Sequence, residues 1–212
     1  MSPALYFRYL VRFRANPLHI AYLSGMKTLD VGCGEGEFLK KDPSNRVGVD
    51  IDEDLVRRCV EKGLMAHCMS ATDLGFPSQC FDAVHAAELI EHLDPATAVR
   101  FLAESARVLK PGGVVYITTP GEQYVWNTFS HIKPYPPIAF EKLLGSSTEG
   151  FIKDQALSLK LERYFAFGIP SRFRVVTGLK RAINIAFPSR QPSGYVIILR
   201  KPLGVSSEDP RL

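Results

Sequence analysis

Three glycines at alternate positions, Gly32, Gly34 and Gly36, follow a short apolar stretch and are the first residues whose types and spacing suggest chemistry. Glycine allows sharp turns and lets a ligand touch the main chain, so such loops recur at nucleotide sites. A dinucleotide fingerprint would need another glycine where this chain has Glu37, and no Gly-Lys-Ser/Thr follows to complete a phosphate loop. The loop therefore favours a nucleotide-like ligand outside those two classes.

Carboxylates around this loop narrow the choice of ligand. Asp30, Glu35 and Glu37 surround the glycines, and their negative charge disfavours a pyrophosphate and favours a cationic or zwitterionic ligand. Asp50 lies eighteen residues after Gly32, at the end of the next apolar stretch, and can accept two hydrogen bonds from a ribose diol. S-adenosylmethionine is a ligand that meets these requirements.

A second group of candidate residues lies in the segment Glu-Leu-Ile-Glu-His at residues 88–92. If this segment is helical, Glu88, Glu91 and His92 share one face, where they could chelate a hard divalent cation or place a carboxylate beside an imidazole. The alternative is that these side chains only brace the loop over the ligand. His92 is thus a candidate both for catalysis and for metal binding.

His131 lies in an aromatic and proline-rich stretch after the fifth predicted strand. A neutral imidazole there could take a proton from an acceptor hydroxyl, or serve as a fourth metal ligand beside Glu88, Glu91 and His92. It could equally be a histidine that only packs within its loop. The neighbouring aromatic side chains could wall an apolar or aromatic acceptor, or form a small core of their own.

The elements that must position these residues alternate between strand and helix. Apolar stretches predict five strands, at residues 27–31, 46–50, 64–70, 81–86 and 113–119, and two closing strands at 159–165 and 195–200. Helices are expected at residues 4–14, from about residue 35, and at 54–62, 95–109 and 138–144. Because parallel neighbours need helical crossovers, this alternation predicts an α/β fold with a doubly wound parallel sheet, whose ligands bind at the carboxyl ends of the strands.

Composition and charge set further limits. The chain has 212 residues, of which 46% are hydrophobic, and this is enough for one well-buried core. The net charge of +4 is uneven, since residues 1–27 carry +4, residues 28–167 carry −6 and residues 168–212 carry +6. Basic ends on an acidic body suggest an anionic partner, and a peripheral membrane contact is one such reading. The other reading is a solvated basic face.

Cysteine usage and the N-terminal sequence bear on localisation. The four cysteines have neither a C-x-x-C pair nor regular spacing, so they indicate no zinc site and no disulfide framework, and they fit a reducing compartment. Arginines interrupt the apolar N-terminus, unlike a signal peptide, and no run approaches the roughly eighteen apolar residues of a membrane span. We therefore expect a cytoplasmic protein, with peripheral membrane association through the basic ends as an addition.

From residue 27 to about residue 120 the chain resembles the class I S-adenosylmethionine-dependent methyltransferases. The stretches that carry the resemblance, in the same order, are residues 29–38, 47–51, 73–82, 88–93 and 108–113. The resemblance implies S-adenosylmethionine as the methyl donor. It also implies a seven-stranded, mostly parallel, Rossmann-like sheet in which the last two strands form an antiparallel edge hairpin. The acceptor does not follow from it.

The resemblance also implies which residues contact the methyl donor. Asp30 and the turn at Gly32, Gly34 and Gly36 would hold the methionine end. Asp50 would bind the ribose hydroxyls, and the following residue would cover one face of the adenine.

The remaining expected contacts involve small or apolar side chains. Ile51 is the residue expected on the adenine face, Ser70 and Ala71 would lie at the adenine edge, and Ala87, directly after the fourth predicted strand, would also border the site. Many relatives have an acidic residue where this chain has Ser70. Glu-x-x-Glu-His segments also occur in quinone-ring O-methyltransferases and in the family that methylates the 3′ ends of small RNAs, where the motif is associated with a bound metal.

We expect a single methyltransferase domain over residues 1–204, comprising an N-terminal helical cap (1–26), a lid (121–137) and a basic amphipathic insertion (168–192), followed by a loose tail (205–212). The expected reaction is O-methylation of a small-molecule or lipid- or glycan-linked acceptor. One alternative is a metal-assisted RNA 2′-O-methyltransferase, and another is a non-catalytic scaffold that keeps the fold. Nucleic acid is the less favoured partner, because no RNA-binding module is recognisable.

Overall fold

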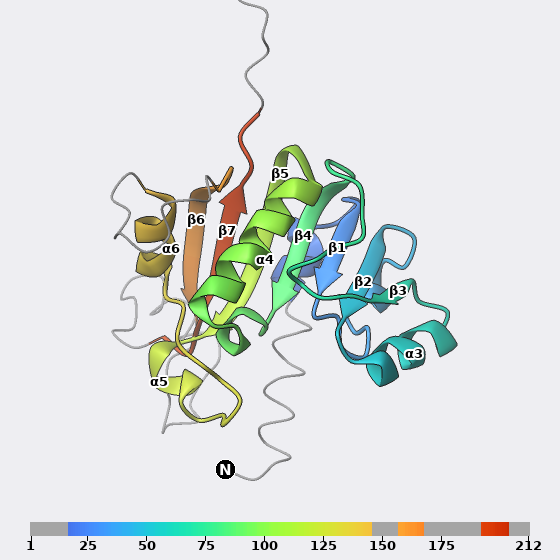
Figure 1. The fold of residues 1–212 in the computed structure, drawn as a ribbon, viewed down its shortest axis with the longest axis horizontal. Coiled ribbons are helices and arrows are strands. Elements are labelled where there is room, and N and C mark those ends of the chain that lie inside the picture. The colour runs from blue at the N-terminus through green and yellow to red at the C-terminus, as the bar shows by residue number, and fades with distance from the viewer. Residues whose placement is uncertain (1–16, 146–156, 168–191, 204–212) are drawn as a thin grey trace, which may run out of the picture.

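The computed structural model describes residues 17–145, 157–167 and 192–203 (Figure 1). The strands are β1 (Thr28–Val31), β2 (Arg46–Asp50), β3 (Ala66–Cys68), β4 (Phe81–Ala87), β5 (Leu109–Pro120), β6 (Lys160–Phe167) and β7 (Gly194–Arg200). The α-helices are α2 (Pro17–Tyr22), α3 (Glu53–Glu61), α4 (Pro95–Val108), α5 (Glu122–Val125) and α6 (Pro137–Leu144), and short 3₁₀ helices span Leu39–Lys41 and Ile90–His92. Each described strand overlaps one that the apolar pattern predicts.

The seven strands form one sheet in the order β3-β2-β1-β4-β5-β7-β6. Strands β1 to β5 are parallel, and β7 lies between β5 and β6 and runs antiparallel to both. The strand order reverses at β1, which has β2 on one side and β4 on the other, so their carboxyl ends border a crevice of the kind in which α/β sheets bind ligands. The predicted doubly wound sheet with an antiparallel edge pair is confirmed.

Apolar side chains alternate along the central strands and pack on both faces of the sheet. Val115 and Ile117 belong to the large cluster that includes α4, whereas Val114 and Tyr116 belong to a second cluster that includes Leu23, directly after α2. Successive residues of a strand point to opposite faces, so α4 and α2 cover opposite sides of β5. Figure 1 shows α4 crossing the sheet in front of β4 and β5.

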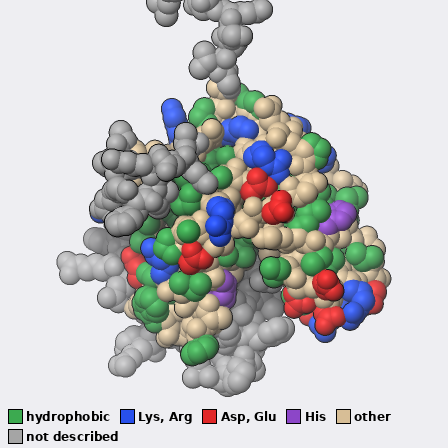
Figure 2. All heavy atoms as spheres, viewed as in Figure 1, with side chains coloured by type: hydrophobic (Ala, Val, Ile, Leu, Met, Phe, Trp, Pro, Cys, Tyr) green, Lys and Arg blue, Asp and Glu red, His purple; other side chains and the backbone are tan. Residues whose placement is uncertain are grey.

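Helix α3 begins at a well-formed cap and carries an exposed, charged surface. The Asp52 side chain accepts hydrogen bonds from the backbone N–H groups of Asp54 and Leu55, which satisfies donors that the first helical turn leaves unpaired. Acidic and basic side chains then gather over this helix at the lower right of Figure 2, where Arg57 pairs with Asp54 and Glu61. Exposed pairs of this kind add little stability and chiefly keep the surface soluble.

Two local expectations are wrong. No α-helix starts near Glu35, because Gly36 has φ +77°, which a right-handed helix cannot contain, and the chain forms only the 3₁₀ turn at Leu39–Lys41. Residues 88–92 are not an α-helix either, because Glu88 has φ +54° and only Ile90–His92 form a 3₁₀ turn. The argument that helical spacing puts the two glutamates and His92 on one face therefore fails.

Several predictions concern segments outside the described residues. These are the helix at 4–14, most of the cap at 1–26, the insertion at 168–192 except its last residue, and the tail at 205–212. Among the helices that the structure does describe, none is long and apolar enough to cross a bilayer. The single-domain organisation stays a prediction.

Candidate functional site

The glycine loop turns at the carboxyl end of β1 through left-handed backbone at Gly32, Gly34 and Gly36, with φ values of +74°, +54° and +77°. L-residues with a side chain rarely adopt this conformation, so the glycines are a backbone requirement. At Gly32 a methyl group would come within 3.2 Å of the Leu89 side chain, so the loop lies against the segment that follows β4. The loop and the Glu-x-x-Glu-His segment are therefore neighbours.

Asp50, the last residue of β2, ties its strand end to the glycine loop. Its carboxylate accepts a hydrogen bond from the Gly34 backbone N–H at 2.8 Å and another from the Asp52 backbone N–H at 3.1 Å. Ile51, the next residue, is 77% exposed. The carboxylate is thus held in place with acceptor capacity left over, and an apolar side chain lies uncovered beside it.

Asp30 is nearly buried at the end of β1, and its Oδ1 accepts a hydrogen bond from His85 Nδ1 at 2.7 Å. A small hollow of about 10 Å³ lies here, lined by Asp30, Gly32, Cys33, Glu37, Phe38, His85 and Ala87. Such a hollow has room for about one water molecule, so most of any ligand would lie outside it, over the glycine loop. Sequence reasoning missed His85, although a histidine inside an apolar strand is a signal, since a buried polar group needs a partner.

Ser70 and Ala71 follow β3 in a short turn. The hydroxyl of Ser70 lies 2.9 Å from the hydroxyl of Thr72 and accepts a hydrogen bond from the Thr72 backbone N–H at 3.2 Å. Both Ser70 and Ala71 are partly exposed. The turn is thus held by hydrogen bonds among its own residues and leaves Ser70 and Ala71 accessible. It lies next to the end of β2, because the Met69 backbone N–H donates to the Asp50 carbonyl.

A second group of polar side chains forms where the segment after β4 meets the lid. Ligand atoms of Glu91, His92 and His131 all lie within 4.8 Å of one another, and the two imidazole rings are 4.6 Å apart, edge to face. The backbone N–H of Ile132 donates to the Glu91 carbonyl at 2.8 Å, which holds the lid against this segment. The structure therefore brings together three of the four residues predicted to bind a metal.

Backbone carbonyls determine the tautomers of the two histidines. His92 Nδ1 donates to the Ser130 carbonyl at 3.2 Å, and His131 Nδ1 donates to the Val125 carbonyl at 2.8 Å. In each neutral ring the lone pair is consequently on Nε2, the arrangement in which histidine accepts a proton or binds a metal. Partial burial and the neighbouring His92 lower the pKa of His131 below its ordinary value, which favours its neutral form.

The two glutamates are held by neighbouring threonines at the end of β5. The Thr118 hydroxyl donates to Glu88 Oε1, and the Thr119 hydroxyl donates to Glu91 Oε2, both at 3.2 Å. Glu91 is fully buried, and burial together with the charge of Glu88 raises its pKa well above the ordinary value. Among the described residues, none donates a hydrogen bond to Glu91 Oε1. Glu88 lies beside the group as a second carboxylate and outside the three-residue cluster.

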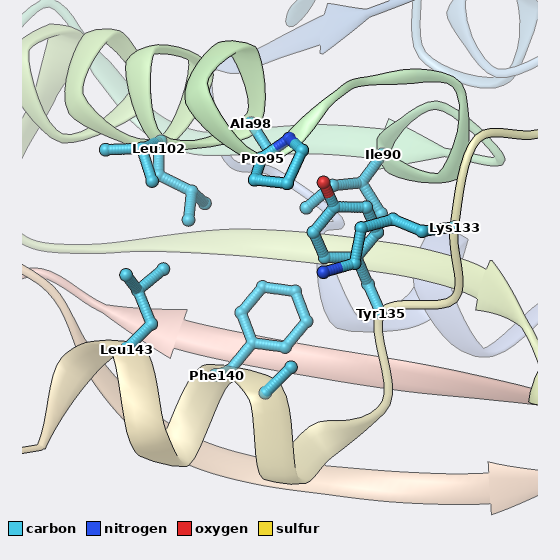
Figure 3. A pocket seen from close by; sticks show the side chains of 10 residues that line it. Ile90, Pro95, Ala98, Leu102, Lys133, Tyr135, Phe140 and Leu143 are labelled. Atoms are coloured by element: carbon cyan, nitrogen blue, oxygen red, sulfur yellow. The ribbon is translucent and has the colours of Figure 1, made fainter. Parts of the chain in front are cut away.

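An apolar hollow of about 110 Å³ lies between α4 and α6 (Figure 3). It is lined by Ile90, Pro95, Ala98, Val99, Leu102, Lys133, Tyr135, Ala139, Phe140 and Leu143. Ile90 precedes Glu91 in the chain, and the Tyr135 hydroxyl donates to the Leu93 carbonyl at 2.9 Å, so the segment after β4 and the lid, which carry the two histidines, also supply residues to this hollow. Figure 3 shows Lys133 and Tyr135 together with Ile90 at one end of it, whereas Phe140 and Leu143 of α6 face the α4 side chains.

Comparisons with known proteins agree with this geometry. Residues 29–117 match a family described as a methyltransferase domain. The ubiquinone biosynthesis O-methyltransferase of Methylococcus capsulatus is 37% identical over 121 residues, which cover 49% of this chain and 50% of that protein. The tRNA (carboxymethyluridine(34)-5-O)-methyltransferase of Arabidopsis thaliana is 34% identical over 113 residues, covering 50% of this chain and 28% of that protein. The chain thus spans half or less of the length of these curated relatives.

Likeness to a solved structure extends over nearly the whole chain. A SAM-dependent methyltransferase from Archaeoglobus fulgidus aligns with 92% of this chain and 99% of its own, with a TM-score of 0.64 and 25% sequence identity. The strand order, the glycine loop at the β1 end and the matched family agree with the resemblance in the sequence. These findings support the class I S-adenosylmethionine-dependent methyltransferase family, to which the resemblance in the sequence points.

Proposed function

We propose that the protein transfers the methyl group of S-adenosylmethionine to an oxygen atom of a small-molecule acceptor. The observation that carries this proposal is that the glycine loop contacts the segment after β4, which bears His92 and meets His131 of the lid. A donor site and a group able to activate an acceptor therefore share one edge of the sheet. Both curated relatives are named for methylation of an oxygen, which supports the choice of acceptor atom.

The residues present fit the methyl donor. Buried Asp30 offers a carboxylate to the ammonium of the methionine end, and the glycine loop allows close approach to the main chain. Asp50 would bind the ribose hydroxyls and exposed Ile51 would pack on the adenine. The partly exposed residues Ser70 and Ala71 would border the adenine, and Ala87 would lie below the sulfonium.

S-adenosylmethionine supplies an electrophilic methyl group on a sulfonium. The protein must align the acceptor oxygen with that methyl group and exclude water, and such positioning supplies much of the acceleration. His131 and His92 can then take the hydroxyl proton at Nε2, because Nδ1 of each ring is committed to a backbone carbonyl. The lowered pKa of His131 keeps this base neutral near pH 7.

We also propose a divalent metal ion at Glu91, His92 and His131. The fit rests on two observations. The buried Glu91 Oε1 accepts no hydrogen bond from any described residue, and the imidazoles of His92 and His131 each use Nδ1 for a backbone carbonyl and carry the lone pair on Nε2. A carboxylate and two imidazoles form a donor set that zinc enzymes use with one position open. A cation there would supply Lewis acidity to an acceptor oxygen, and the two histidines would then be ligands rather than bases.

An apolar acceptor suits the surroundings of the histidine pair. The hollow between α4 and α6 is lined mainly by apolar side chains, with Lys133 and Tyr135 as the exceptions, and we propose that it holds an apolar part of the acceptor. The lid adds three large exposed apolar side chains, Trp126, Phe129 and Ile132. A lipid-linked acceptor fits these features. Contact with a membrane through the basic ends stays a prediction from charge, since residues 1–16 and 168–191 lie outside the described residues.

Calorimetry followed by a labelling assay tests the proposed function. The wild-type protein should bind S-adenosylhomocysteine and should move labelled methyl from S-adenosylmethionine into a lipid extract or a hydroxylated aromatic compound. Dialysis against EDTA, with metal analysis before and after, separates metal-assisted transfer from transfer by a histidine base.

Other outcomes of these assays identify the alternatives. Label in total tRNA would favour RNA methylation, the second candidate, which the tRNA methyltransferase relative supports. No heat with either S-adenosylmethionine or S-adenosylhomocysteine would contradict the proposal and favour the scaffold.

A further inference from the structure

A chain of three polar side chains is buried under the glycine loop. Asp30 of β1, His85 of β4 and His19 of α2 are 3%, 1% and 0% exposed. Asp30 Oδ1 lies 2.7 Å from His85 Nδ1, and His85 Nε2 lies 2.9 Å from His19 Nδ1. These three hydrogen-bonded side chains thus connect a helix on one face of the sheet to the carboxylate at the edge of the methyl-donor site.

The sheet register and aromatic walls hold this chain in place. Asp30 and His85 are directly paired across β1 and β4, so their side chains project from the same face. The Phe38 ring stacks on His85 with a centroid distance of 3.9 Å, and the Tyr116 ring stacks on His19 at 5.7 Å. These rings exclude water, which strengthens the hydrogen bonds and makes a lost partner costly.

The direction of each hydrogen bond follows from the carboxylate. An ionised Asp30 can only accept, so His85 Nδ1 donates to it, and in the neutral ring His85 Nε2 then accepts from His19 Nδ1. His19 thereby selects the tautomer of His85 that Asp30 needs. With Oδ1 committed to His85, Oδ2 is the oxygen that Asp30 can offer to a ligand at the hollow that both residues line.

We propose that His85 and His19 are positioning residues that orient Asp30 toward the ammonium of the methionine end of S-adenosylmethionine. This inference rests on the proposed function and adds two residues to it. Packing alone would not need the arrangement, because apolar side chains in this cluster would avoid the cost of burying three polar groups. The hydrogen bonds from His19 through His85 to Asp30 also make the affinity for the methyl donor depend on how α2 packs on the sheet. By linkage, the bound donor stabilises the packed position of α2.

Paired substitutions and paired ligands test this role. His85→Asn places an amide donor near the position of Nδ1, whereas His85→Leu keeps an apolar side chain and no donor. S-adenosylhomocysteine contains the amino-acid end, and 5′-methylthioadenosine lacks it. Calorimetry should show that His85→Leu weakens the affinity for S-adenosylhomocysteine by about tenfold or more, the effect of losing a hydrogen bond to a charged group. The affinity for 5′-methylthioadenosine should change by less than about threefold.

The conservative variant and the outer histidine complete the test. His85→Asn should bind S-adenosylhomocysteine within about threefold of wild type, and His19→Leu should weaken it more than His19→Asn does. Should His85→Leu fail to fold by circular dichroism, the His19 pair decides the question by the same two ligands.

Each other outcome has a definite meaning. Unchanged S-adenosylhomocysteine affinity in His85→Leu, or an equal loss for both ligands, would overturn the positioning role while leaving the proposed function intact. A wild-type protein that binds neither ligand would instead contradict the proposed function itself, and this inference with it.

Discussion

Glu91 is a buried carboxyl group whose pKa is raised by burial and by the charge of Glu88. An acid with a raised pKa stabilises the fold while it is protonated, and this contribution is lost as pH rises through its folded-state pKa. We expect Glu91→Gln to raise the melting temperature of the metal-free protein at pH 8 by about 2–4 °C, the shift that about 1 kcal/mol produces in a protein of this size. Scanning calorimetry in EDTA measures it.

Glu104 provides a control of opposite sign for this prediction. Its carboxylate pairs with Arg107 and accepts from the Leu74 backbone N–H, and the Arg107 hydrogen bond lowers its pKa. Glu104→Gln should therefore lower the melting temperature under the same conditions. A variant at position 91 that melts at or below the wild-type temperature would show that its buried charge carries no penalty.

His131 has a lowered pKa, so the folded protein binds its proton more weakly than the unfolded chain does. Its contribution to stability is complete above the unfolded value of about 6.5 and is lost as pH falls below it. Between pH 8 and pH 5.5 the urea midpoint of the metal-free protein should fall further in wild type than in His131→Asn, which keeps a donor for the Val125 carbonyl. Equal falls would mean that the histidine does not control this pH dependence.

The glycine loop contains three residues with left-handed backbone, at Gly32, Gly34 and Gly36. Gly36 and Gly63 have nearly the same φ, +77° and +74°, but a methyl group at Gly36 would come within 2.6 Å of Leu64 Cδ1, and one at Gly63 would meet nothing within 4 Å. Gly63→Ala should cost about 1–2 kcal/mol for left-handed backbone. Gly36→Ala should cost about 1–3 kcal/mol more for overpacking.

Urea unfolding of the two alanine variants measures the difference in the free energy of unfolding. Equal losses would indicate that Leu64 moves aside at no cost. Binding of S-adenosylhomocysteine gives a second readout, since only Gly36→Ala alters the loop itself. The pair thus separates the cost of a backbone conformation from the cost of a close approach.

Strands were more predictable than loops at the scale of elements. The strand at Arg46–Asp50 has the predicted bounds, because apolar side chains and the acid that ends the run are local signals. The helix expected near residue 35 and the helical face expected at residues 88–92 were wrong. Positive φ at Gly36 and Glu88 is incompatible with an α-helix and overrides the helix preference of the neighbouring residues. The residue types alone do not predict such a conformation.

S-adenosylhomocysteine, the compound that S-adenosylmethionine becomes after methyl transfer, should raise the free energy of unfolding of the whole molecule. A ligand that binds only the folded state adds about 2.7 kcal/mol at 100 times its Kd. S-adenosylhomocysteine at that concentration should therefore raise the melting temperature by about 5–10 °C in a protein of this size. Adenosine triphosphate is the matched control, because the acidic loop disfavours a pyrophosphate. An equal shift with both ligands would contradict the assignment of the site to S-adenosylmethionine.

The sheet order places the two candidate groups at one edge of the molecule. β1 joins the half that bears Asp50 to the half that bears the histidine pair, and the lid crosses from the end of β5 to α6. The predicted fold is confirmed at this scale and the family that the sequence resembles is supported, whereas the roles of the individual site residues stay proposals. The proposed acceptor site rests on the lid and on the hollow between α4 and α6, which are separate in the chain from the glycine loop.

By itself the sequence determined the strand pattern, the glycine loop and the class of methyl donor. These follow from local properties: apolar periodicity, glycine where the backbone must turn, and acids at strand ends. Only the tertiary structure decided that His131 meets His92 and Glu91, and that His85 and His19 stand behind Asp30. Such contacts depend on which strands pair and in which register, and pairing between residues far apart in the chain is governed by packing of the whole sheet.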